Sequence, residues 1–356
     1  MTLSTDNDFV RLGVWPPCAA VLSQMRVDLI QRYPTPGGFS VETYFARLLE
    51  VFPEFGIDAA LHTVPFPSRG LLPRLRAVHY VRRFRDGIVH ITGDIHFAAL
   101  GLDPRRTVVT VLDCGTLHRL RGVTREIFRQ AWFYWPLQHV AAITVISEAT
   151  KVDLLRWIPT LDPAKIHVVP VAISPLYKQS PKPFDLGTPR ILQVGTKYNK
   201  NVPRLIRALR DIPCHLVIVG DLDGEMRQLL RDCSISHTNL VDITDDALAV
   251  EYQKTDIVAF ASTFEGFGMP IVEAQAVGRP VITGNCSSMP EVAGQGAALV
   301  DPHDVESIRA AVLRVITDAT YRDTLVQEGY ANAARFDNRR IAGQYRDIYR
   351  TIRITS

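Results

Sequence analysis

Short runs of β-branched and aliphatic residues alternate with helix-periodic segments through the second half of this 356-residue chain, and no other feature limits the fold as strongly. Alternation of this kind predicts βαβ units with right-handed crossovers and a parallel sheet covered by helices on both faces. Strands are expected at 190–195, 215–220, 239–243, 256–261, 280–283 and 298–300, and helices at 202–209, 225–231, 245–254, 268–277 and 304–316.

The first half shows the same alternation with longer insertions. Strands are expected at 88–91, 107–112, 143–146 and 166–169, and helices at 41–52, 126–142 and 149–158. Between the halves, residues 177–189 are rich in Pro and Lys and have no periodicity, which is typical of a linker. We therefore expect an α/β protein with two domains and a ligand site in the cleft, beyond the carboxyl ends of the strands.

The overall charge excludes some classes of protein. The chain has 40 Lys and Arg against 37 Asp and Glu, too even a balance for a histone-like nucleic-acid binder, so no nucleic-acid partner is expected. Residues 1–180 hold 20 basic and 15 acidic side chains, whereas residues 181–356 hold 20 and 22. An anionic partner is therefore expected to meet the first half.

Targeting and cysteine patterns point to a cytoplasmic protein. The five cysteines are scattered and include no Cys-x-x-Cys pair, so neither a disulfide framework nor a structural zinc site is expected. The first residues lack the pattern of a signal peptide, and no run of about 18 apolar residues predicts a membrane span. Glycine-rich dinucleotide and P-loop motifs and a Gly-x-Ser-x-Gly elbow are also missing, which disfavours dehydrogenases, NTPases and serine hydrolases.

The most informative stretch is 264–274, Phe-Glu-Gly-Phe-Gly-Met-Pro-Ile-Val-Glu-Ala, which follows an expected strand and opens an expected helix. Gly266 and Gly268 allow close approach of the backbone, and Pro270 suits a first helical turn. The free N–H groups of such a helix start can bind an anion. Glu265 and Glu273 are eight residues apart, but spacing alone is explained equally well by a tight turn with capping and solvated carboxylates.

The Glu265 to Glu273 stretch resembles the signature of retaining glycosyltransferases of family 4, which have the GT-B fold of two Rossmann-like domains around a cleft. The resemblance covers essentially the whole chain, is strongest over 190–300 and is looser over 1–180. Further similar motifs are Gln193-Val194-Gly195-Thr196 with Lys200-Asn201, Val219-Gly220-Asp221, Gly37-Gly38-Phe39-Ser40, Ile146-Ser147-Glu148 and Val168-Val169-Pro170-Val171.

This resemblance implies a transferase that moves a sugar from a nucleotide-diphosphate donor, UDP- or GDP-linked, to an acceptor hydroxyl in glycan, polysaccharide or glycolipid assembly. It implies an N-terminal acceptor-binding domain at 1–180, a donor-binding domain at 181–337 and a C-terminal helix within 338–356 that crosses back. No cofactor or metal is expected, because the donor is a substrate and a lysine with a helix N-terminus supplies the positive charge.

The resemblance also assigns roles to residues. Glu273 is expected to bind the ribose, Glu265 to lie beside the sugar, and Lys200 to neutralise the diphosphate. Backbone N–H groups of Phe267, Gly268 and Met269 should reach the sugar and diphosphate, and Asp242 and Ile243 should lie near the base. The expected donor site is completed by Gly38, Gly195, Thr196, Lys197 and Gly266, and the expected catalytic set by Asp113.

The chain departs from the family pattern at two positions. Asn199 stands where many relatives have a second basic residue, and Lys197 is a candidate replacement. Leu112 stands where many relatives have a histidine, although Asp113 follows it. On the acceptor side Asp94, His96 and His118 are expected to bind sugar; a metal site at His90, Asp94 and His96 is the alternative.

Two further stretches allow alternative interpretations. Asp221-Leu222-Asp223 could hold a metal, as in GT-A transferases, or simply serve a turn. Arginines alternate with apolar residues over 69–85, which is typical either of a solvated helix face or of a segment that lies on an anionic membrane. The acceptor is therefore expected to be a glycan or a lipid-linked glycan at the cytoplasmic membrane face. A sugar-nucleotide epimerase and a catalytically silent sugar-binding module remain alternatives.

Overall fold

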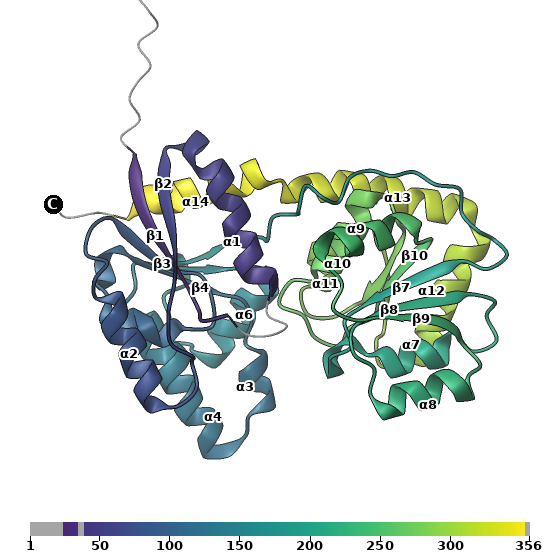
Figure 1. The fold of residues 1–356 in the computed structure, drawn as a ribbon, viewed down its shortest axis with the longest axis horizontal. Coiled ribbons are helices and arrows are strands. Elements are labelled where there is room, and N and C mark those ends of the chain that lie inside the picture. Colours follow the sequence, from purple (N-terminus) through teal and green to yellow (C-terminus); the bar gives the residue numbers. More distant parts are fainter. Residues whose placement is uncertain (1–23, 35–38, 353–356) are drawn as a thin grey trace, which may run out of the picture.

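Two parallel six-stranded sheets lie side by side in the computed structural model, which describes residues 24–34 and 39–352 (Figure 1). The first sheet has the order β2-β1-β3-β4-β5-β6. Its strands are β1 Met25–Gln31, β2 Ile57–Thr63, β3 Ile88–Ile91, β4 Thr107–Val111, β5 Ala142–Val145 and β6 Ile166–Val168. The helices connecting them are α1 Phe39–Val51, α2 Leu71–Val81, α3 Gly115–Arg119, α4 Gly122–Phe128, α5 Trp135–Gln138 and α6 Glu148–Trp157.

The second sheet has the order β12-β11-β10-β7-β8-β9. Its strands are β7 Arg190–Val194, β8 His215–Val219, β9 Ser236–Leu240, β10 Ile257–Phe260, β11 Val281–Gly284 and β12 Ala297–Val300. Its helices are α7 Val202–Ala208, α8 Gly224–Asp232, α9 Asp245–Lys254, α10 Met269–Val277, α11 Met289–Ala293, α12 Val305–Thr317 and α13 Ala319–Ala333. The predicted α/β architecture with parallel sheets is confirmed.

Each sheet is wound in both directions from one strand. In the second sheet the chain runs outward from β7 through β8 to β9, then returns to the other side of β7 with β10. The carboxyl ends of β7 and β10 therefore flank a topological switch point, where open α/β sheets bind ligands. In the first sheet the corresponding point lies between β1 and β3.

The last helix, α14 Asn338–Thr351, leaves the second sheet and packs against the first (Figure 1). Its Tyr345 and Tyr349 are fully buried beside Phe45 of α1 and Phe52. The Tyr349 hydroxyl also meets Nδ1 of His90 in β3 at 2.7 Å. The end of the chain is thus part of the core of the first sheet.

Two expected elements were wrong. The predicted helix at 126–142 ends at Gln138, because the apolar residues Ala142–Val145 pair with β4 and β6 and are fully buried as β5. The predicted strand at 239–243 lies at Ser236–Leu240, where it pairs with β8. Asp242 cannot extend that strand, because its φ of 53° is left-handed.

Strands β1 and β2 and helices α3 and α13 had no predicted counterpart, whereas α2 lies within 69–85, where a solvated helix face was one of the two interpretations. In β1 the charged residues Arg26 and Asp28 interrupt the apolar run, although Asp28 is only 2 % exposed because it pairs with Nε2 of His62 at 2.8 Å. Within the described residues, no helix combines the length and the apolar character that spanning a membrane requires.

Candidate functional site

The loops after β7 and β10 lie side by side at the switch point of the second sheet. The Thr263 N–H donates to the carbonyl oxygen of Asn199 at 2.8 Å, and Asn199 Nδ2 donates to the carbonyl oxygen of Phe264 at 2.9 Å. Asn201 Nδ2 donates to the carbonyl oxygen of Ala261 at 2.9 Å. We call the part of the chain built on the first sheet the first domain, and the part built on the second sheet the second domain. These bonds join loop 195–201 and loop 261–268 into one rigid surface that faces the first domain.

Lys200 and Glu265 form an ion pair at the centre of this surface. Lys200 Nζ lies 2.7 Å from Glu265 Oε1, which also accepts a hydrogen bond from Asn199 Nδ2 at 3.1 Å. The stem of Lys200 packs against Gly195, where an added Cβ would lie 3.1 Å from Lys200 Cε, and the ammonium lies 4.5 Å from the Phe260 ring centre. Both charged side chains are largely buried, and each is an ionic partner of the other in this structure.

The glycines of 264–268 shape the start of helix α10. Gly268 has a φ of 105° and directly precedes the helix, and Pro270 occupies its first turn. Two serines that follow β11 hold the carbonyl oxygens of the loop. Ser287 Oγ donates to the carbonyl oxygen of Glu265 at 2.5 Å, and Ser288 Oγ donates to that of Phe267 at 2.8 Å. Pro270 has no N–H, and the Ile271 N–H donates to the Gly268 carbonyl oxygen at 3.0 Å. The Met269 N–H has no acceptor within the helix and, with the preceding N–H groups of Phe267 and Gly268, can bind an anion.

Glu273 lies in the second turn of α10 and is 9 % exposed. Its Oε2 accepts a hydrogen bond from the Tyr252 hydroxyl at 2.7 Å. Burial raises the pKa of Glu273 to about 7, although the hydrogen bond from Tyr252 acts in the opposite direction. Asp245 of α9 raises the pKa further, and Arg47 of α1, which pairs with Asp245 at 3.2 Å, lowers it. This carboxyl therefore titrates near neutral pH.

The first domain contributes Asp113 and His118, which lie beyond the end of β4. Asp113 Oδ1 accepts the Gly115 N–H at 2.7 Å, and desolvation in the cleft raises the pKa of Asp113. His118 Nε2 lies 2.6 Å from Asp153 Oδ2, and the His118 ring packs on Phe264 with 5.4 Å between centroids. His118 therefore touches the residue next to Glu265 from the opposite domain.

The structure separates the other acceptor-side candidates. Asp94 pairs with Arg32 at 3.1 Å and is largely exposed. His96, in contrast, is 2 % exposed, packs against Phe133 and finds no hydrogen-bond partner for either ring nitrogen among the described residues. Burial lowers the pKa of His96 to about 4. The His96 ring is therefore in the core and does not reach the cleft surface beside Asp94 and His118.

The remaining donor-site candidates lie in different surroundings. Thr196 packs against Gly220, where an added Cβ would lie 2.9 Å from its Oγ1, and Lys197 is exposed beside it. Asp242 and Ile243 lie between β9 and α9. Gly38 falls outside the described residues.

Asp223 of the Asp-x-Asp motif is the N-cap of α8 and accepts the Met226 N–H at 2.8 Å. Within the described residues, no group of three or more His, Cys, Asp or Glu side chains has the arrangement of a metal site. The hydrogen bond that Asp223 accepts therefore fits the interpretation of Asp221-Leu222-Asp223 as a turn.

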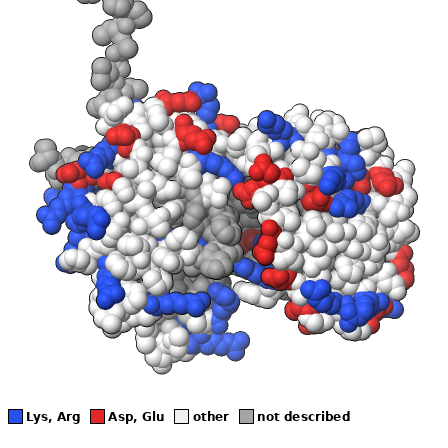
Figure 2. Space-filling model, viewed as in Figure 1, with Lys and Arg blue, Asp and Glu red and all other residues white. Residues whose placement is uncertain are grey.

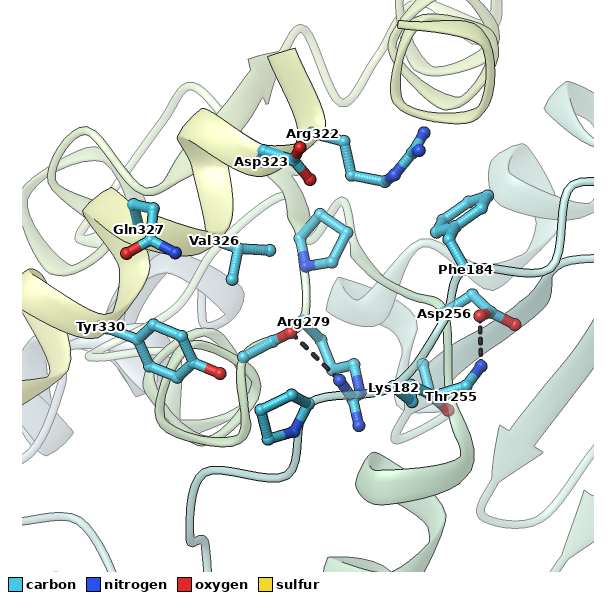
Figure 3. Close-up of a pocket in the computed structure, with 13 residues that line it drawn as sticks. Lys182, Phe184, Thr255, Asp256, Arg279, Arg322, Asp323, Val326, Gln327 and Tyr330 are labelled. Carbon is cyan, nitrogen blue, oxygen red and sulfur yellow. Dashed lines mark hydrogen bonds and ion pairs between the residues drawn. The ribbon is translucent and has the colours of Figure 1, made fainter. Parts of the chain in front are cut away.

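A cavity of about 320 Å³ lies at the other edge of the second sheet, near the amino ends of β10 and β11 (Figure 3). Its cations are already paired. Arg279 donates to four backbone carbonyl groups, Lys182 bonds to Asp256, and Arg322 stacks on Phe184. This cavity is where residues 181–184 pack onto the second domain, and its cations contact backbone carbonyl groups, a carboxylate and an aromatic ring of that same region.

Four residues of the site were not predicted as functional. Ser287 and Ser288 hold the loop, Tyr252 bonds to Glu273, and Arg47 reaches across from α1. Serines directly after a strand at the switch-point edge are the sequence signal for the first two. Tyr252 and Arg47 carry no such signal, because only the folded chain brings them to Glu273 and Asp245.

The second domain resembles known protein families more clearly than the first. Residues 178–332 match the family model described as glycosyl transferases group 1. The O-antigen chain mannosyltransferase B of Escherichia coli is 36 % identical over 94 residues, which are 26 % of this chain and 25 % of that protein. The MMP alpha-(1->4)-mannosyltransferase of Mycolicibacterium hassiacum is 26 % identical over 227 residues, 60 % of this chain and 54 % of that protein. The chain thus spans about a quarter and about half of these relatives.

A solved structure matches nearly the whole chain. Sucrose-phosphate synthase from Thermosynechococcus elongatus superimposes with a TM-score of 0.78 at 19 % identity, covering 92 % of this chain and 99 % of that one. The two proteins therefore share one fold over both sheets.

Proposed function

We propose that this chain, which has the GT-B fold and whose residues 178–332 match the family model of glycosyl transferases group 1, is a glycosyltransferase that uses a nucleotide-diphosphate sugar. The observation that supports this most directly is the Lys200–Glu265 pair, 2.7 Å apart, beside the start of helix α10 at the switch point. A cation and a set of free N–H groups suit a diphosphate, and the adjoining carboxylate suits sugar hydroxyls.

The proposed reaction breaks the bond between the sugar and the diphosphate while the acceptor hydroxyl attacks the same carbon, and the hydroxyl proton passes to the departing phosphate oxygen. Negative charge builds on the departing diphosphate, and Lys200 with the N–H groups of Phe267, Gly268 and Met269 stabilises it. Lys200 moves from Glu265 toward the phosphate, which leaves Glu265 to accept hydrogen bonds from the sugar. No metal is needed for this division of roles. We propose retention of configuration, with attack and departure on one face of the sugar.

The nucleoside is proposed to lie deeper in the second domain. Glu273 would accept hydrogen bonds from the ribose, since it sits one to two turns along α10 from the diphosphate. Gly195, Thr196 and Lys197 would border the phosphates, and Asp242 and Ile243 would lie near the base, UDP- or GDP-linked. Asp113 would face the reacting sugar from the first domain.

The acceptor is proposed to be a glycan or lipid-linked glycan bound by the first domain, near Asp94 and His118. Helix α2 has three exposed leucines, Leu71, Leu72 and Leu75. Several arginines of 69–85 are exposed around them, whereas Arg74 stacks on Trp132 at 4.3 Å. Figure 2 shows Lys and Arg side chains along the lower part of this domain. We propose that this segment contacts the anionic cytoplasmic face of a membrane, each basic residue contributing about 1 kcal/mol.

Vesicle binding tests the membrane contact. The protein should sediment with anionic vesicles and be released by salt, and Leu72→Ser with Arg76→Ser should weaken the binding. Equal sedimentation with neutral and anionic vesicles would contradict the proposal.

The donor is tested by thermal stabilisation with UDP-, GDP- and ADP-linked sugars, mannose first because both relatives named above are mannosyltransferases. A ligand at 100 times its dissociation constant stabilises the fold by about 2.7 kcal/mol. The stabilising donor is then incubated with and without acceptor, and the anomeric configuration of the product is read by NMR. Epimerised donor in the reaction without acceptor would favour a sugar-nucleotide epimerase instead.

A further inference from the structure

The two domains meet where the start of helix α6 touches loop 264–268. Ser147 Oγ donates to the carbonyl oxygen of Gly266 at 2.7 Å, and Thr150 Oγ1 lies 3.3 Å from the same oxygen. An added Cβ on Gly266 would lie 2.3 Å from the Leu112 carbonyl oxygen at the end of β4. The peptide directly after Glu265 is therefore held by the opposite domain.

A second contact completes this junction. The carboxylate of Glu291, in α11 of the second domain, accepts the N–H groups of Glu148 and Ala149 at 3.1 Å each. The first N–H groups of a helix have no partner within it, and a carboxylate there is favoured by the helix dipole. Ser147 caps only the Thr150 N–H. A residue of the other domain thus supplies the rest of the cap of α6.

Glu291 and the Glu265 loop form one unit. Ser287 and Ser288, four and three residues before Glu291, hold the carbonyl groups of Glu265 and Phe267. Partial burial between the domains raises the pKa of Glu291, although its two backbone hydrogen bonds act in the opposite direction. Docking of this unit on α6 buries the carboxylate and the helix start together. Parting of the domains would break the bonds of Glu291 to Glu148 and Ala149 together with those of Ser147 and Thr150 to Gly266.

We propose that Glu291 is a positioning residue: its bonds to the start of α6 hold the cleft closed and set the place of the loop that carries Glu265. The effect of Glu291 on the reaction rate rests on the proposed function, whereas its effect on the contact between the domains does not. The structural part concerns the two domains alone.

Hydrogen exchange tests the structural part without any donor. Within the described part of the chain the amides of Glu148 and Ala149 have only Glu291 as acceptor. Glu291→Ala should therefore speed their exchange about tenfold or more, and Glu291→Gln should give an intermediate rate. Glu148→Gln is the matched control, because it removes a carboxylate from the same turn without touching the bonds to Glu291. Unchanged exchange in Glu291→Ala, or equal acceleration in Glu148→Gln, would overturn the proposal.

Kinetics test the positioning role once a donor is known. Glu291→Ala should lower kcat about tenfold while the donor KM stays within about twofold, since small misplacements of a reacting group are costly. Glu291→Gln should recover part of the rate. Thr150→Val, which leaves Glu291 in place, should also lower kcat. Each variant is first checked for an unchanged melting temperature, and wild-type kcat in both Glu291→Ala and Thr150→Val would overturn the role.

A failure of the proposed function is recognised separately. If no UDP-, GDP- or ADP-linked sugar is transferred by the wild type, the kinetic arm gives no rate for any variant. The exchange of the α6 amides still decides whether Glu291 holds the domains together.

Discussion

The two sheets have the same number of strands and the same parallel layout, but they keep their polar side chains in different places. In the first sheet, polar groups lie in the middle: His90 Nε2 meets Thr110 Oγ1 at 2.7 Å, and Thr110 meets Thr144 at 2.7 Å. All three side chains are fully buried. In the second sheet, strands β8 and β10 are apolar inside, and charged groups gather at the two edges.

Because of this difference, the buried polar groups of the first sheet serve the assembly of the fold, whereas the charged groups at the ends of the second sheet's strands are placed for ligand binding. The buried chain of the first sheet ends at Tyr349 and so attaches α14. The edge groups of the second sheet, Lys200 and Glu265, sit where a ligand can reach them. We therefore expect changes in the first set to alter folding and changes in the second set to alter the reaction.

The largest expected effect is acid destabilisation of the first domain. Burial lowers the pKa of His90 to about 3 and that of His96 to about 4, whereas both have a pKa near 6.5 in the unfolded chain. The unfolded state therefore binds more protons below pH 6.5, and each histidine lowers the stability by up to about 1.4 kcal/mol per pH unit. Glu273, whose pKa is raised, acts in the opposite direction above pH 4.5.

The expected net loss is on the order of 3 kcal/mol between pH 6.5 and pH 4. Urea unfolding at several pH values measures it. His90→Leu, which cannot take up a proton, should reduce the slope by about one proton. An unchanged slope in that variant would mean that His90 is charged in the folded protein.

The second effect concerns the edge of the second sheet. Lys200→Ala should lower kcat about 100-fold, equivalent to about 2.7 kcal/mol, because it removes a preorganised charge at the leaving group. Glu265→Ala should lower kcat to a similar extent. Steady-state kinetics measure both, with Lys178→Ala, an exposed lysine of the linker, as the control. Near wild-type kcat in both variants would place the reaction elsewhere.

A third effect sharpens the role of Glu273. With a pKa of about 7, its carboxyl becomes protonated as the pH falls below neutrality and then loses an acceptor for the ribose. The donor KM should therefore rise below pH 7, by up to about tenfold per pH unit, with a smaller change in kcat. In Glu273→Gln the KM should be high and independent of pH. A wild-type KM that is flat between pH 6 and pH 8 contradicts this assignment.

The smallest effect is expected at the loop after β8 of the second sheet. Asp223 caps α8, so Asp223→Ala should cost about 1 kcal/mol of stability and change kcat less than twofold.

Transfer should also survive EDTA, because Lys200 and the start of α10 serve as the positive groups. Activity that EDTA abolishes and Mn²⁺ or Mg²⁺ restores would favour the metal-dependent alternative at Asp221 and Asp223.

The strands of the second sheet other than β9, and the Glu265 to Glu273 stretch, were predictable for a physical reason. Strands buried on both faces are continuous apolar runs, and a turn such as 264–270 needs glycine and proline at particular positions. Strand β1 was not predictable, because Asp28 is buried through its bond to His62, which lies 34 residues away. The same limit applies to His96, whose polar ring the sequence places with Asp94 and the fold places in the core.

The sequence by itself determined the parallel α/β architecture, most strands of the two sheets and the loop that carries Glu265, since these depend on local periodicity and on turn residues. Only the tertiary structure decided which residues meet across the cleft. The bond from Glu291 to the start of α6 and the packing of His118 on Phe264 join segments more than 140 residues apart. Such contacts depend on how whole domains pack, and no local pattern of residues encodes them.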